Sequence, residues 1–201
     1  MTFEELFSYT NLYKSACNCL KGTRWKTNNQ LYMNSISSNI YQTIHELKNG
    51  TFVFGNYSNF IINERGKERY ITSTPIKQRV VQRCLCDYYL NEKLTKCFIY
   101  DNMACQKGKG LHKAQFRFKE ILTDYVNKYK TTQGYILQYD IHNYFGSIPH
   151  KSIINMLDSK IDDKKILKVC ENIINSFPTD VGLGLGSQLS QLCALYYLND
   201  V

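Results

Sequence analysis

Hydrophobic residues recur along most of the chain at the spacing of α-helices. Between residues 28 and 47, apolar or aromatic side chains return every three to five positions, as on one buried helix face. Thr2 followed by Glu5 is typical of a capped helix start, and Asn49-Gly50 is typical of a helix end. The pattern predicts helices over these ranges: 2–21, 28–47, 75–96, 111–130, 150–158, 162–176 and from about 187 onward.

After residue 50 the pattern changes to short apolar runs that favour strands. Phe52–Phe54 and Asn59–Ile62 are such runs, and Arg69–Ile71 is expected to return antiparallel after a turn at Glu64–Lys67. Residues Gly134–Ile141 form a longer apolar run and predict a central strand. Helices mixed with hairpin strands in this order indicate an α+β fold.

Composition narrows the class of protein. The chain has 201 residues, 43% of them hydrophobic, with only three prolines, which suits one domain or part of a larger one. Its eight cysteines show neither C-x-x-C nor zinc-ligand spacing, so we expect free, mostly buried thiols in a reducing compartment. The sequence has no signal peptide and no apolar run of about 18 residues, which predicts a cytoplasmic protein without a membrane partner.

The net charge of +8 is concentrated in one window. Residues 65–119 carry thirteen basic and four acidic residues, a local balance of +9 that accounts for the whole excess. Such a block suits a phosphate-binding surface, although a solvated surface without a ligand is an equal alternative from charge alone.

Asp140 is the first candidate for chemistry. It ends the apolar run 134–141, and Phe145 follows five residues later. A carboxylate on a rigid strand end can hold Mg²⁺. An Asp in such a place more often caps a turn, so the residue needs supporting context.

A glycine-rich turn provides that context. Gly182-Leu183-Gly184-Leu185-Gly186 leads into an apolar helix that begins near Ser187. Glycines let the backbone approach a nucleotide closely, but G-x-G-x-G by itself also fits a plain strand-to-helix turn.

Taken in order, these segments resemble reverse transcriptases of the group II intron, retron and diversity-generating type. The resemblance covers residues 63–201 through four ordered segments: the hairpin 64–71, Pro75–Gln82, the run 139–150 and the glycine turn. It implies the fingers and partial palm of a right-hand polymerase over residues 51–201, after a helical N-terminal extension over 1–50.

The implied reaction is transfer of a deoxynucleotide to a primer 3′-hydroxyl with the help of two Mg²⁺ ions. RNA template, DNA or RNA primer and deoxynucleoside triphosphates are the implied partners. By the resemblance, Asp140 binds both metals and the Ile141 carbonyl contacts one. The backbone N–H groups of Asn143 and Tyr144 face the triphosphate, and Phe145 rejects a 2′-hydroxyl.

The resemblance assigns further roles to the glycine turn and the basic residues. Gly186 shapes the floor under the base pair, and Arg69 on the returning strand grips the triphosphate by its planar fork. Arg79 contacts template phosphate or holds a structural ion pair, and these alternatives are equal. The remaining nucleic-acid contacts are assigned to Arg65, Lys67, Lys107, Lys109 and Lys113.

The chain also departs from the family pattern. Gly184 replaces a Pro, which leaves the turn less preorganised, and Leu185 and Gln191 replace a Gln and a Pro, as in diversity-generator enzymes. No Asp-Asp pair follows the glycine turn, while Asp162-Asp163 precedes it. We therefore expect a chain truncated before the Asp-Asp motif that cannot polymerise alone. Two alternatives stay open: a non-catalytic RNA- or DNA-binding module, and a defence-type enzyme with untemplated synthesis.

Overall fold

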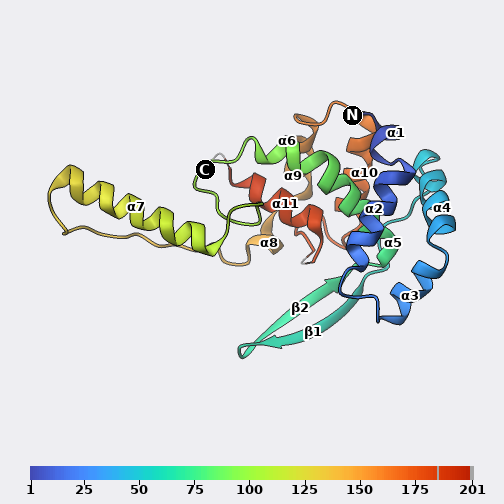
Figure 1. Cartoon of the computed structure of the whole chain (residues 1–201), viewed down its shortest axis with the longest axis horizontal. Coiled ribbons are helices and arrows are strands. Elements are labelled where there is room, and N and C mark those ends of the chain that lie inside the picture. The colour runs from blue at the N-terminus through green and yellow to red at the C-terminus, as the bar shows by residue number, and fades with distance from the viewer. Residues whose placement is uncertain (185, 200–201) are drawn as a thin grey trace.

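The structure is a computed structural model that describes residues 1–184 and 186–199. The described residues form a helical body, a projecting β-hairpin and a long helix, α7, that extends away from the body (Figure 1). The coarse α+β class is therefore confirmed, although the sheet is only the two-stranded hairpin. No described helix is both long and apolar enough to cross a membrane.

The N-terminal segment forms four helices where the hydrophobic pattern predicts two. These are α1 (Phe3–Leu6), α2 (Tyr9–Leu20), α3 (Thr27–Asn34) and α4 (Ile36–Lys48). The predicted capping box of Thr2 and Glu5 is present. The single helices were wrong because Ser8 is extended between α1 and α2, and Ser35 breaks the helix between α3 and α4.

The predicted hairpin is confirmed. Strands β1 (Ser58–Glu64) and β2 (Lys67–Ser73) pair antiparallel, with Glu64 opposite Lys67. The turn residues Arg65 and Gly66 have φ values of 52° and 78°, as the right-handed twist of a two-residue hairpin requires. The predicted strand Phe52–Phe54 is not formed, because Phe52 is instead buried in the helical core and stacks near Phe54.

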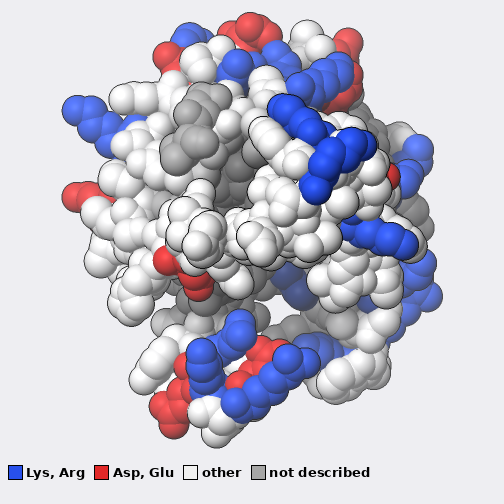
Figure 2. Space-filling view, turned by 90° about the vertical axis from the view of Figure 1, so that its left-hand side faces the viewer, with Lys and Arg blue, Asp and Glu red and all other residues white. Residues whose placement is uncertain are grey.

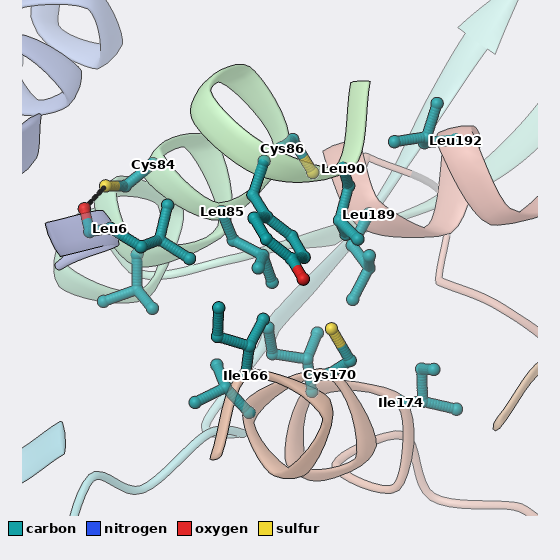
Figure 3. Packing of buried hydrophobic residues seen from close by; sticks show 14 of the residues in the cluster. Leu6, Cys84, Leu85, Cys86, Leu90, Ile166, Cys170, Ile174, Leu189 and Leu192 are labelled. Carbon is teal, nitrogen blue, oxygen red and sulfur yellow. Dashed lines mark hydrogen bonds between the residues drawn. The ribbon is translucent and has the colours of Figure 1, made fainter. Parts of the chain in front are cut away.

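The long helix predicted over 75–96 is confirmed as three consecutive segments. Helix α5 (Ile76–Leu85) continues through a π-helical stretch, η1 (Cys86–Leu90), into α6 (Asn91–Thr95). Its apolar face, with α1, α10 (Lys164–Ile174) and α11 (Gln188–Tyr197), forms the hydrophobic core (Figure 3). This cluster is continuous across the predicted boundary at residue 50.

All eight cysteines are free, as predicted. Cys84, Cys86, Cys170 and Cys193 are buried in the core, and Cys105 is exposed. Cys84 Sγ lies 3.3 Å from the Leu6 carbonyl oxygen, to which it donates (Figure 3). Burial raises the pKa of the Cys84 and Cys193 thiols to about 12.

The predicted central strand 134–141 is wrong. Helix α7 (Leu111–Tyr129) is as predicted, but the residues after it run back beside it as extended, unpaired chain (Figure 1). Tyr135, Leu137 and Tyr139 are all at least 80% exposed. A strand exists only through hydrogen bonds to a neighbouring strand, and the described residues supply no neighbour for this segment.

The C-terminal part returns to the body and completes the core. A short helix, α8 (Tyr144–Ser147), precedes α9 (His150–Asp158) and α10, and Ser187 caps α11 by accepting from the Ser190 amide. The predicted helices near 150–158, near 162–176 and after 187 are confirmed, with α10 beginning at Lys164.

Candidate functional site

Backbone hydrogen bonds join the glycine turn to the segment that follows Asp140. The Leu183 amide donates to the Phe145 carbonyl at 2.7 Å, and the Gly182 amide donates to the Ile148 carbonyl at 2.8 Å. His150 closes the junction by donating from Nε2 to the Gly182 carbonyl at 2.7 Å. Two motifs separated by about forty residues therefore lie side by side.

The side chain of Phe145 lines a pocket at this junction. The pocket has a volume of about 250 Å³, and its wall includes Gly186, Gln188 and Gln191. The neighbouring Tyr144 is fixed to α11, because its hydroxyl donates to the Ala194 carbonyl at 2.5 Å. Burial raises the pKa of Tyr144 to about 12, so this hydroxyl stays protonated as a donor. Phe145 and Gly186, to which the resemblance assigns separate roles at the nucleotide, therefore line one pocket.

The glycines of the turn meet specific packing requirements. Gly186 has a φ of 105°, and a Cβ at this position would lie 3.1 Å from the Thr72 carbonyl oxygen of β2. A Cβ on Gly184 would overlap the ring of Phe177. The Phe177 ring therefore leaves no room for a side chain at position 184. Leu185, noted above for its departure from that pattern, lies outside the described residues.

Asp140 and Ile141 lie in the exposed extended segment before α8. A carboxylate and a backbone carbonyl are oxygen donors of the kind that Mg²⁺ takes. Among residues 1–184 and 186–199, however, no group of three or more metal-ligating side chains could hold an ion. These two donors do not by themselves fit a pair of metal ions. Asn143, at φ 48°, begins α8 in the left-handed region with its side chain folded against Gly146.

The acidic pair Asp162-Asp163 has structural contacts instead. The Asp163 carboxylate caps α10 by accepting from the Lys165 and Ile166 amides, and it also accepts from the Phe3 amide at 2.9 Å. Asp162 pairs with Lys93 at 2.6 Å, and that contact holds the pKa of the Asp162 carboxyl below its ordinary value. Both carboxylates of the pair therefore make structural contacts.

The hairpin carries the predicted triphosphate contact, Arg69, on β2. Its guanidinium pairs with Glu64 across the hairpin at 3.0 Å, with both side chains more than half exposed. Such an exposed pair contributes little to stability, so a phosphate can compete for the guanidinium. Arg65 and Lys67 lie at the exposed turn, and basic and acidic side chains alternate over the hairpin at the lower edge of Figure 2.

The basic window divides into paired and unpaired residues. Six of its basic residues form ion pairs with carboxylates: Arg69, Lys77, Arg83, Lys93, Lys96 and Arg117. Within the described part of the chain, the six residues predicted to contact nucleic acid make no ion pair: Arg65, Lys67, Arg79, Lys107, Lys109 and Lys113. Their positive charge is therefore available to an external anion.

Of these six, Lys109 has a local structural contact. Its ammonium donates to the carbonyls of Tyr100 and Asn102, both at 2.9 Å, and so closes the loop before α7. Lys107 and Lys113 are exposed nearby. These three lysines lie at the start of α7 or just before it, and none of them lines the Phe145 pocket.

Arg79 lies in a different environment, at the N-terminal half of α5. Its Nη2 is 3.4 Å from the Asn29 Oδ1, while its Nε is buried without a hydrogen-bond partner among the described residues. Among residues 1–184 and 186–199, the structural ion pair considered for Arg79 is therefore not formed. Gln82, one turn later, is 2% exposed and has an unpartnered Nε2.

Sequence reasoning missed the surroundings of Arg79. The sequence pattern Pro75–Gln82 includes Gln82 but assigns it no function, and no sequence motif includes Trp25. The signal for Trp25 was present, because it is the only tryptophan in the chain and stands between Arg24 and Lys26. No protein-family model matches the chain, and no curated protein matches its sequence.

Proposed function

We propose that this chain provides the nucleotide-binding and template-binding surface of an RNA-directed DNA polymerase. The observation that carries the proposal is the pocket lined by Phe145 and Gly186, which shares Gly186 with a neighbouring hollow lined by Arg79. An aromatic ring opposite a glycine floor can select a deoxyribose by shape, because a 2′-hydroxyl would clash with the ring. Arg69 and the hairpin then bind the triphosphate by charge.

The proposal assigns binding and orientation to the described residues. Phe145 is held in place from both sides, by the Leu183 amide on its carbonyl and by Tyr144 anchored to α11. Bound Mg²⁺ would neutralise phosphate charge in this class of reaction. Asp140 and Ile141 would contribute two oxygen donors to its site, which the side chains of the described residues do not complete.

Replacement of Phe145 tests the proposal directly. In the presence of a primed RNA template, we expect the chain to bind a deoxynucleoside triphosphate about tenfold more tightly than the matching ribonucleotide. The Phe145→Ala variant should lose most of this preference, because the clash with the 2′-hydroxyl is gone. Equilibrium dialysis with labelled dGTP and GTP measures both affinities.

Phe145→Tyr is the matched control, since it keeps the ring and should keep the preference. The proposal would be contradicted by equal binding of both nucleotides to the unmodified chain. Salt-sensitive binding of the primed template without any nucleotide binding would favour the alternative of a non-catalytic module, which the unpaired basic residues also support.

The chain alone is expected to extend no primer. Residues 1–184 and 186–199 contain no side-chain cluster able to hold a metal ion, so the charge on the reacting phosphate stays uncompensated. A primer-extension assay with Mg²⁺, dNTPs and a primed RNA template measures this. Robust Mg²⁺-dependent extension would show that the chain builds the missing site, and extension without any template would favour the defence-type alternative.

A further inference from the structure

Three hollows on the described surface follow one another. The Phe145 pocket shares Gly186 and Gln188 with a second hollow of about 180 Å³. The second hollow shares Arg79 with a third, of about 700 Å³, whose wall includes Trp25. We call this series the Trp25 groove. It leads from the proposed nucleotide pocket, past the start of α5, to the segment between α2 and α3.

The middle of the groove contains hydrogen-bond donors without acceptors. Gln82 lines it with a side chain fixed by the Ser187 hydroxyl, which donates to Gln82 Oε1 at 2.9 Å. This contact leaves Gln82 Nε2 unpartnered, and the buried Nε of Arg79 is unpartnered beside it among the described residues. A buried donor without an acceptor is unfavourable, so an oxygen-rich ligand would be favoured here. Phosphate and base carbonyl oxygens are such acceptors.

The outer end of the groove presents an aromatic surface. The Trp25 side chain is 73% exposed, and the Lys26 ammonium lies 5.5 Å from its ring centroid. An exposed indole is costly to leave in water and offers a face on which a nucleobase stacks. The adjacent cation suits the phosphate that follows a stacked base.

We propose that the Trp25 groove binds a single-stranded polynucleotide, with an unpaired base stacked on Trp25 and a phosphate at Arg79. Stacking on the indole requires a base that is free of its Watson–Crick partner, which selects a single strand over a duplex. The inference rests on the proposed function, since it gives the template strand a path from the nucleotide pocket. It also assigns a role to the N-terminal helices, which frame the outer end of that path.

The single tryptophan allows a direct test. Trp25 fluorescence is followed while oligouridine or oligothymidine of about twelve nucleotides is added, a length that matches single-strand sites. We expect strong quenching by the single strands and little by a duplex of the same length. Binding measured by anisotropy should weaken about tenfold for Trp25→Ala, since base–aromatic stacking contributes about 1–3 kcal/mol. Trp25→Phe should retain most of the affinity.

A second variant tests the phosphate contact. Arg79→Gln should weaken binding, and it should reduce the magnitude of the slope of log affinity against log salt concentration by about 1, the value for one phosphate contact. Arg79→Lys keeps the positive charge and should keep the slope. Tyr41→Ala is the matched control for loss of an exposed aromatic, because Tyr41 is 65% exposed on α4 and does not line the groove. It should bind like the unmodified chain.

The outcomes separate this inference from the proposed function. The groove assignment is overturned if oligonucleotides bind without changing Trp25 fluorescence and if Trp25→Ala binds them equally well. The sugar preference at Phe145 is tested separately, by the nucleotide-binding assay. A stronger response to oligouridine or to oligothymidine identifies the strand as RNA or DNA. Quenching by the duplex equal to that by single strands also overturns the proposal.

Discussion

Raising the pH from about 8 to about 10 is expected to lower the free energy of unfolding by about 4–6 kcal/mol. The cause is the set of buried thiols at Cys84, Cys86, Cys170 and Cys193, whose pKa values burial raises above the ordinary value of 9.0. The expected loss is comparable to the whole stability of a typical domain. The protein should therefore be close to unfolding at the upper pH.

The sign follows from which state binds more protons. In the unfolded chain these thiols lose their protons as the pH passes 9, whereas in the folded chain Cys84 and Cys193 retain theirs to about 12. Between these values the native state holds more protons, so each thiol lowers stability by about 1.4 kcal/mol per pH unit. Their full contribution to stability is present below pH 9 and is lost as the pH rises toward 12.

Urea unfolding under a reductant, followed by circular dichroism at the two pH values, measures the loss. Cys193→Ala should show a loss smaller by about 1 kcal/mol, because the thiol whose pKa burial raises to about 12 is removed. Cys105→Ala is the matched control, since Cys105 is exposed and should leave the loss unchanged. Equal losses in both variants would assign the pH dependence to other groups.

Leu90→Ala is expected to destabilise the fold by about 3 kcal/mol. Leu90 is fully buried in the π-helical stretch η1 and lies beside Leu189 of α11 (Figure 3). The substitution removes buried apolar surface and leaves a cavity that rigid helices on both sides cannot close. Urea unfolding at neutral pH measures the change.

Leu111→Ala provides the comparison, because Leu111 is 73% exposed on α7 and should change stability by less than about 0.5 kcal/mol. Similar values for the two variants would mean that the packing around η1 is loose and that the core lies elsewhere.

Local sequence signals predicted the elements whose geometry depends on a few adjacent residues. Arg65-Gly66 predicted the hairpin turn, and the apolar spacing of residues 75–96 predicted the long helix. The breaks at Ser8 and Ser35 were not predictable in this way, because the apolar pattern continues through both. Near the two breaks, Phe7 and Tyr32 are buried in the core, a tertiary contact that the local pattern does not reveal.

Long-range contacts explain the other differences. Whether residues 134–141 form a strand depends on a neighbouring strand that local sequence does not reveal. The glycine at position 184 is explained by packing, because a Cβ there would overlap the ring of Phe177. In the candidate site, the resemblance assigned Phe145 and Gly186 to the nucleotide, and the folded chain places both in one pocket. The path from Gly186 through Gln82 to Trp25 required the folded chain, since its members lie far apart in sequence.

The extended segment after α7 has a consequence for handling the protein. Residues 134–139 contain two tyrosines, an isoleucine and a leucine, with no charge and no proline. Their backbone has no ladder partner among the described residues. A short, uncharged, β-prone segment with open amides and carbonyls is a template for pairing with the same segment of another molecule. At high concentration the chain is therefore prone to aggregate through this edge, and a lysine introduced at Leu137 would suppress fibril formation.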